Sequence, residues 1–151
     1  MKYQALLDEI YSEVLPMLGN GRVADYIPAL SHIDPTKFGI AIETIEGERF
    51  EVGDSQEQFS IQSISKVFNL ALCIRLIGDQ VWERVGIEPS GNPFNSLVQL
   101  EYEKGIPRNP FINAGALAVT DLLLDHLDQP NGDMLKFVEK LQCSNVKFNS
   151  V

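Results

Sequence analysis

The sequence has few of the features that mark membrane, disulfide-stabilised or metal-binding proteins. Its 151 residues include only two cysteines, Cys73 and Cys143, which lack the close spacing of a redox motif or a metal-binding pair. We expect both to be reduced and structural. No apolar run reaches the roughly 18 residues that a membrane-spanning helix needs. The first residues lead into an acidic amphipathic segment rather than an export signal, so we expect a cytoplasmic protein without a membrane partner.

Basic residues are also scarce. The chain has 12 Lys and Arg against 21 Asp and Glu, which gives a formal net charge of -9 and an isoelectric point of about 4.6. A phosphate backbone would be repelled on average, so we expect no nucleic-acid partner. Hydrophobic residues make up 44% of the sequence, which is enough for one packed domain.

The first part of the sequence predicts a helix and then a loop. Apolar residues recur at helical spacing over residues 3–18, and Gly19 ends the pattern. Residues 23–30 are expected to be irregular, because Pro28 biases the residue before it away from helical backbone angles. A loop at this place is suited to binding.

A β-hairpin is predicted next. Residues 38–45 alternate with β-branched side chains, residues 46–48 can turn, and residues 49–52 resume the extended pattern. A lone hairpin is marginal in water, and the sequence after it offers no further convincing strand. We therefore expect additional chain beyond Val151.

The remaining sequence predicts three helices, at residues 64–77, 113–127 and 134–141. The first is apolar on all sides, which predicts burial in a core, and Gly78 is placed to cap it. Between the first two helices, Pro, Gly and Asn are concentrated in long loops, which indicates ordered turns. The order of helix, hairpin and helices predicts an α+β fold.

Ser63 and Lys66 are the candidate reactive pair. They lie three residues apart at the start of an apolar helix, so they share one face. A serine hydroxyl attacks an amide poorly unless a neighbour takes its proton, which lysine does when its surroundings lower its pKa. The apolar helix predicts that desolvation. The Ser63 N–H, near the helix amino terminus, is placed to form half of an oxyanion hole.

The spacing of this pair is weak support by itself. Ten serines and seven lysines in 151 positions give roughly half a Ser-x-x-Lys match by chance. Ser144 and Lys147 form a second match without an apolar helix behind it, and we interpret it as a decoy. The structural alternative for the first pair is a serine N-cap followed by a surface lysine. The apolar residues after Lys66 bring the two interpretations to equal weight.

Four short blocks of sequence occur in a specific order: DYIP at 25–28, QSISK at 62–66, GIEPSG at 86–91 and PRNPFINAGA at 107–116. Together they resemble the successive signatures of the bacterial and mitochondrial serine-dependent glutaminases. The resemblance covers nearly all of the chain, but the catalytic domain of the family is longer. The chain therefore resembles the amino-terminal half of that domain.

This resemblance implies a fold similar to serine β-lactamases and penicillin-binding proteins. Residues 1–54 would supply the helix and hairpin of its α/β part, and residues 59–151 would supply most of its helical part, all within one catalytic domain. The implied reaction converts L-glutamine and water to L-glutamate and ammonia without metal or organic cofactor. Ser63 would be the nucleophile and Lys66 its base, with a glutamyl-enzyme as intermediate.

The resemblance also implies that Asn113, Tyr26 and Gln62 contact bound glutamine, together with Ser63. Each has a structural alternative from the sequence alone. Asn113 is equally suited to cap the helix that it begins. Tyr26 is suited to be a buried aromatic with a bonded hydroxyl, and Gln62 to be a solvated loop residue. We assign only structural roles to Glu88, Asn109, Arg108 and His32.

The family's remaining pocket residues fall outside this chain. They include a glutamate, a further asparagine, two tyrosines and the second oxyanion donor, so the isolated 151-residue polypeptide is expected to be inactive. Family members are homo-oligomers, which implies a dimer or tetramer.

Two competing functions share parts of the pattern. A β-lactamase or DD-peptidase-like acyltransferase would also use Ser63 and Lys66, but the Ser-Asp-Asn or Tyr-x-Asn triplet of those enzymes is absent from the sequence. In the other alternative, the helices form a non-catalytic assembly module. Turnover of glutamine or of a penicillin-like substrate by the purified protein distinguishes the three.

Overall fold

A computed structural model describes residues 2–91 and 98–142 of the chain. The described residues divide into two compact units, residues 2–60 and residues 61–91 with 98–142. The first unit contains one long helix and a two-stranded antiparallel sheet, whereas the described part of the second is helical. Because the helices and the antiparallel strands follow one another in separate segments, this is the predicted α+β arrangement.

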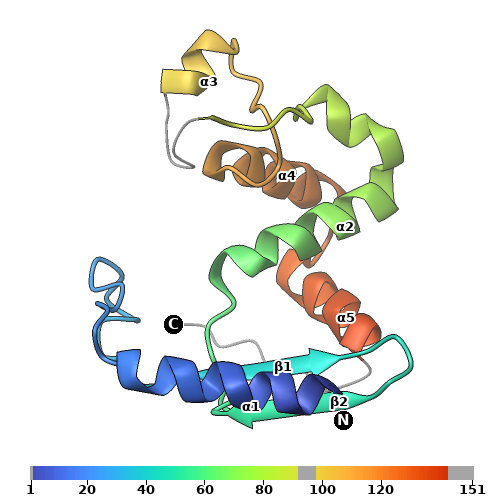
Figure 1. Ribbon diagram of the computed structural model, residues 1–151. Helices are drawn as coiled ribbons and strands as arrows, with labels where there is room; N and C mark the ends of the chain where they lie inside the picture. Colours follow the sequence, from blue (N-terminus) through green and yellow to red (C-terminus); the bar gives the residue numbers. More distant parts are fainter. Residues whose placement is uncertain (1, 92–97, 143–151) are drawn as a thin grey trace. The chain divides into compact units, whose positions relative to one another are not determined.

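In the first unit, helix α1 (Lys2–Val14) continues into a 3-10 turn, η1 (Leu15–Met17), close to the predicted helix at 3–18. Figure 1 shows α1 lying along the hairpin. Leu7 is the buried residue of α1, and two ring pairs join helix and strands: Tyr3 with Phe50 and Tyr11 with Phe38. The amphipathic pattern of the sequence thus directs one face of the helix onto the sheet.

The hairpin consists of β1 (Gly39–Glu43) and β2 (Arg49–Gly53), within one residue or two of the predicted strands. The strands pair in register from Gly39 opposite Gly53 to Glu43 opposite Arg49. At the turn, the Gly47 N–H donates to the Thr44 carbonyl at 3.0 Å, and Gly47 has φ of 84°. Glycine adopts this backbone angle without steric cost, so the Glu-Gly-Glu turn closes the hairpin.

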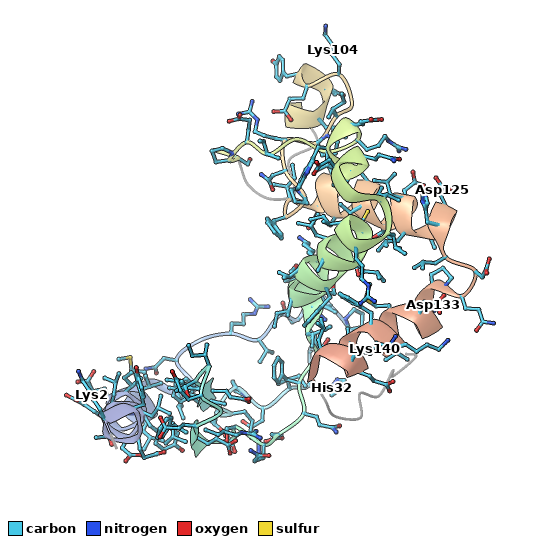
Figure 2. The ribbon with its side chains drawn as sticks, turned by 90° about the vertical axis from the view of Figure 1, so that its right-hand side faces the viewer. Lys2, His32, Lys104, Asp125, Asp133 and Lys140 are labelled. Atoms are coloured by element: carbon cyan, nitrogen blue, oxygen red, sulfur yellow. The ribbon has the colours of Figure 1, made fainter. Side chains whose placement is uncertain are left out.

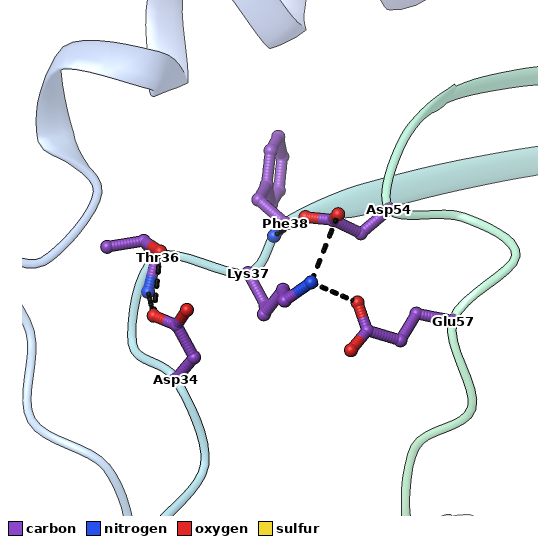
Figure 3. A network of polar contacts seen from close by, with 6 residues as sticks. All are labelled: Asp34, Thr36, Lys37, Phe38, Asp54 and Glu57. Atoms are coloured by element: carbon purple, nitrogen blue, oxygen red, sulfur yellow. Dashed lines mark hydrogen bonds and ion pairs between the residues drawn. The ribbon is translucent and has the colours of Figure 1, made fainter.

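A polar network joins the residues just before β1 to the residues just after β2 (Figure 3). The Lys37 ammonium lies 2.6 Å from Glu57 and 3.6 Å from Asp54, while Asp54 also accepts the Phe38 N–H at 3.0 Å. The hydrogen bond to Glu57 and the charge of Asp54 raise the pKa of Lys37. A raised lysine pKa stabilises the fold below the unfolded pKa, and this contribution disappears as pH rises through the folded pKa.

Successive turns connect η1 to β1, as predicted for residues 23–30. Tyr26 lies in one of these turns, and 80% of its surface is exposed. The alternative in which Tyr26 is a buried aromatic is therefore wrong for the described residues. Most of this residue is therefore open to a ligand or to water.

The second unit begins with η2 (Gln62–Ile64) and α2 (Ser65–Ile77), followed by η3 (Gly78–Glu83) and α3 (Val98–Tyr102). Helices α4 (Asn113–His126) and α5 (Pro130–Gln142) complete the described part. Their core has a shared apolar character and comprises Leu72, Cys73, Val81, Val85, Val119, Leu122, Leu123, Phe137 and Val138. Burial raises the pKa of the Cys73 thiol, which fits a structural cysteine, and the structure records this thiol as free. Cys143 and the Ser144–Lys147 decoy lie outside the described residues.

The prediction that residues 64–77 form a helix ending at Gly78 is confirmed, with Gly78 at φ of 59°. The expectation of burial on all sides is wrong. Leu72 and Cys73 are buried, but Val67 is 54% exposed and Leu76 43% exposed. The cause is that α4, η3 and α5 pack against only part of the circumference of α2.

Helix α5 starts four residues earlier than the predicted helix at 134–141. Pro130 occupies its first turn, where a missing N–H costs nothing, and the Asp133 carboxylate accepts the Gln129 N–H at 3.3 Å.

Asp125 and Lys140 project outward from α4 and α5 (Figure 2). None of the helices in the described ranges is both long and apolar enough to cross a membrane.

Candidate functional site

An open groove between α2 and α4 gathers most of the predicted site residues. Its volume is about 420 Å³. The lining comes entirely from the second unit and consists of Gln62, Ser63, Ser65, Lys66, Asn69, Asn113, Ala116, Leu117 and Thr120. Two segments nearly 50 residues apart in sequence therefore form one cavity, whose lining includes several polar side chains.

Ser63 lies in η2, immediately before α2, and its side chain is exposed. The η2 turn that contains Ser63 is closed by Ser65, whose hydroxyl donates to the Gln62 carbonyl at 2.7 Å. The Ser63 hydroxyl itself makes no hydrogen bond to another residue in the described ranges. Because α2 begins just after it, Ser63 lies at the positive end of a 13-residue helix dipole.

Lys66 is held across the groove by the segment before α4. Its Nζ donates to the Phe111 carbonyl at 2.9 Å and to Asn113 Oδ1 at 2.8 Å. The residue is half-buried, so the alternative of a freely solvated surface lysine does not describe it. A neutral amine can donate the same two hydrogen bonds and keep its lone pair for a proton. The geometry is therefore compatible with a base as well as with an ammonium ion.

Asn113 is the first residue of α4, but it does not cap the helix. The N-cap residue is Ile112, which has extended backbone angles, and no side chain bonds to the first turn there. The capping alternative for Asn113 is therefore wrong. Its Oδ1 receives the Lys66 hydrogen bond instead, and its Nδ2 has no hydrogen-bond partner among residues 2–91 and 98–142. That amide donor is available to a ligand in the groove.

Gln62 adopts a left-handed backbone conformation with φ of 42°. Residues other than glycine, asparagine and aspartate rarely adopt this backbone angle. Backbone strain of this kind is concentrated at functional sites. The side chain of Gln62 is exposed and lines the groove. The structure thus brings together four of the five predicted site residues, namely Gln62, Ser63, Lys66 and Asn113. The fifth, Tyr26, belongs to the other unit.

Asn69 and Thr120 are groove residues that the sequence interpretation missed. Asn69 Nδ2 donates to Thr120 Oγ1 at 3.3 Å, and the Thr120 hydroxyl donates to the Ala116 carbonyl at 2.8 Å. Asn69 lies three residues after Lys66, so helical spacing from the candidate base places both on one face. The same rule, applied from Asn113 along α4, identifies Thr120.

In the described ranges, His, Cys, Asp and Glu side chains form no group of three or more that could hold a metal ion. The polar groups of the groove are instead hydroxyls, amides and one amine. Hydroxyl and amide groups suit the recognition of a small polar molecule by hydrogen bonds.

Comparison with known proteins identifies the family. The sequence profile of the Glutaminase family matches residues 21–151. The thermolabile glutaminase of Rhizobium etli is 58% identical over 140 residues, covering 91% of this chain and 45% of that protein. Glutaminase 2 of Escherichia coli is 53% identical, covering 97% of this chain and 48% of that protein. The chain thus spans about half the length of the curated relatives that it matches.

Solved structures agree with the sequence comparison. A native-form structure of the protein Mglu superposes with a TM-score of 0.85 at 33% identity, covering 99% of this chain and 37% of that one. A probable glutaminase from Bacillus subtilis gives a TM-score of 0.78 at 30% identity, covering 97% of this chain and 45% of that one. The predicted fold class, α+β of the β-lactamase-like type found in glutaminases, is confirmed. The chain belongs to the glutaminase family.

Proposed function

We propose that the protein hydrolyses the side-chain amide of L-glutamine to give L-glutamate and ammonia. One observation supports this most strongly: Lys66 Nζ is fixed by Phe111 O and Asn113 Oδ1 in the groove that also contains Ser63. Membership of the glutaminase family makes an amide substrate the natural choice for this serine and lysine.

In the proposed first step, Ser63 Oγ attacks the amide carbon while Lys66 takes the hydroxyl proton. The backbone N–H of Ser63, at the amino end of α2, donates to the oxyanion that forms. Lys66 then returns the proton to the amide nitrogen, and ammonia leaves a glutamyl ester on Ser63. In the second step Lys66 takes a proton from water, which attacks the ester, and the proton returns to Ser63 Oγ as glutamate departs. Neither step needs a metal or an organic cofactor.

Substrate binding is assigned to the same groove. The Asn113 Nδ2 group, which has no partner among the described residues, donates to an oxygen of bound glutamine. We propose that Gln62, which lines the same groove, contributes its side-chain amide. We also propose Tyr26 as a substrate contact, and its exposed hydroxyl is consistent with this role.

The isolated 151-residue polypeptide is proposed to be inactive. It spans about half of its curated relatives, and the groove has an open rim rather than an enclosed pocket. Losing one oxyanion donor alone costs roughly a hundredfold or more in rate. Joining these residues to the remaining part of the Rhizobium etli relative should restore ammonia release. If residues 1–151 alone release ammonia from glutamine at the same rate as this joined polypeptide, the proposal that the isolated polypeptide is inactive is wrong.

The substrate and the base are tested together with the protein at its natural length. Ammonia release from glutamine should be rapid and lowered at least about a hundredfold by Lys66→Ala, whereas hydrolysis of a penicillin-like lactam, followed as ring opening, should be absent. Lys136→Ala is the matched control, because Lys136 is an exposed lysine of α5 whose ion-pair partner is Asp133. Hydrolysis of the lactam in place of glutamine would favour the acyltransferase alternative. If Lys66→Ala kept full activity, the proposal that Lys66 is the base would be wrong.

Three further proposals concern assembly, location and partners. We propose a homo-oligomer, dimer or tetramer, on the basis of the family alone, and light scattering of the purified protein tests it. A cytoplasmic location remains a prediction of the sequence, which cell fractionation tests. The acidic charge of the chain supports the proposal that neither nucleic acid nor an anionic membrane surface is a partner.

A further inference from the structure

The side-chain amide of Asn109 joins three backbone groups near the groove without lining it. Its Nδ2 donates to the Glu88 carbonyl at 3.0 Å. Its Oδ1 accepts two N–H groups, from Phe111 at 3.0 Å and from Ile112 at 3.1 Å. An asparagine that accepts from the N–H two residues ahead forms an Asx turn, which fixes the direction of the backbone that follows.

The turn made by Asn109 is anchored to the rest of the second unit. The Gly86 N–H donates to the Pro107 carbonyl at 2.8 Å, and the Glu88 N–H donates to the Arg108 carbonyl at 2.9 Å. Together with the Asn109 amide, these bonds attach residues 107–109 to residues 86–88. The turn therefore starts from a fixed point of the fold.

The two acceptors of Lys66 lie directly after this turn. Phe111 supplies a carbonyl and Asn113 supplies Oδ1, so both depend on the path of the chain from Asn109. The start of α4 also packs closely on the turn: a Cβ on Gly115 would lie 1.8 Å from the Asn109 carbonyl oxygen. Glycine at that position allows the helix to begin against the turn itself.

We propose that Asn109 is a positioning residue for Lys66. By fixing residues 111–113, it places both acceptors so that the Nζ atom is held in the groove that Ser63 also lines. Asn109 itself touches neither the groove nor, by this account, the substrate. The role rests on the proposed function in one respect, because the consequence for turnover requires Lys66 to act on Ser63.

The first test needs no turnover. Lys66 and Lys136 are labelled with an amine-reactive ester in the purified chain, and the two labelling rates are compared by peptide mass spectrometry. Asn109→Ala should raise the labelling of Lys66 about fivefold, the effect of one hydrogen bond released, and leave Lys136 unchanged. Asp133→Ala, which removes a side-chain bond to the Gln129 N–H and the ion pair of Lys136 elsewhere in the same unit, should leave the labelling rate of Lys66 unchanged while that of Lys136 rises.

The second test uses glutamine turnover by the protein at its natural length. Asn109→Ala should lower kcat roughly ten- to a hundredfold, since small misplacements of a reacting group have effects of this size. Asp133→Ala should change kcat by less than about twofold even if it lowers stability as much. Asn109→Ser, whose hydroxyl can still accept the Phe111 N–H without adding charge, should recover part of the loss.

The outcomes separate the inference from the proposed function. If Lys66 labels at the wild-type rate in Asn109→Ala, or kcat falls no further than in Asp133→Ala, the positioning role is wrong. If labelling rises as expected but Ser63→Ala still releases ammonia at the wild-type rate, the positioning role stands and the proposed mechanism fails.

Discussion

Replacing Gly115 with alanine should disturb the groove from a position that does not line it. The added Cβ would lie 1.8 Å from the Asn109 carbonyl oxygen, 2.8 Å from the carbon of that carbonyl and 3.0 Å from Pro110 Cα. All three are backbone atoms, so no flexible side chain can move aside. The start of α4 must therefore shift away from the turn at Asn109.

The size of the effect follows from these contacts. The distance of 1.8 Å must open to about 3.4 Å for ordinary van der Waals contact, and overpacking of this kind costs about 1–3 kcal/mol. Alanine offsets about 1 kcal/mol through its higher helix propensity. A shift of similar size would also break the bond of 2.8 Å between Lys66 Nζ and Asn113 Oδ1. We expect a net destabilisation of roughly 1 kcal/mol and at least a tenfold loss of kcat.

Urea unfolding at equilibrium and steady-state ammonia release measure the two effects. Gly132→Ala in α5 is the matched control, because the nearest atom to its new Cβ is Gln129 Oε1 at 3.7 Å, an ordinary contact. Helix propensity then prevails, and this variant should gain about 0.5–1 kcal/mol without a change in kinetics. If Gly115→Ala stabilises the protein as Gly132→Ala does, and kcat is unchanged, the described packing of α4 on the turn is wrong.

Three other predictions concern single contacts. The hydrogen bond from the Thr36 hydroxyl lowers the pKa of Asp34 (Figure 3), so Thr36→Val should destabilise the protein at neutral pH. In unfolding experiments, the difference in stability between this variant and the wild type should vanish below the folded pKa of Asp34. Gln62→Gly should leave stability equal or up to about 1 kcal/mol higher because it relieves a left-handed angle, yet raise KM for glutamine if the side chain binds substrate. A double-mutant cycle of Asn69→Ala and Thr120→Val should give a coupling of about 1 kcal/mol, and a value near zero would mean that their hydrogen bond does not stabilise the groove.

The regular elements were largely predictable from the sequence because each has a strong local signal. The hairpin follows from alternation on both sides of a Glu-Gly-Glu turn, and its strands match within a residue or two. The three main helices after it follow from composition and length. By contrast, α3 and η3 have five and six residues, too few for a hydrophobic period to emerge, and neither was predicted.

The site was predictable only in part, because its decisive contacts are tertiary. Ser63 and Lys66 could be paired by helical spacing. The bond from Lys66 to the Phe111 carbonyl spans 45 residues and leaves no local trace in the sequence. Whether Asn113 caps a helix or faces a lysine is likewise decided by what packs beside it, since the local sequence suits both roles.

Asn109 illustrates the same limit from the other direction. Its sequence context predicts only a structural role, and its three hydrogen bonds are indeed to backbone groups. The sequence could not reveal that the turn made by Asn109 leads directly to the two residues that accept hydrogen bonds from Lys66. The exposed apolar residues of α2, such as Val67, reflect a similar limit, because a helical period does not say how many sides will find a partner.

The most direct test of the account is ammonia release from glutamine by the Ser63→Ala protein at its natural length. We predict a loss of at least about a thousandfold, with normal unfolding behaviour, because removing a serine nucleophile leaves only binding and oxyanion stabilisation. Ser12→Ala, which removes an exposed hydroxyl of α1 that donates to the Asp8 carbonyl, should retain wild-type activity. A Ser63→Ala protein that releases ammonia at the wild-type rate would contradict the assignment of Ser63 as nucleophile.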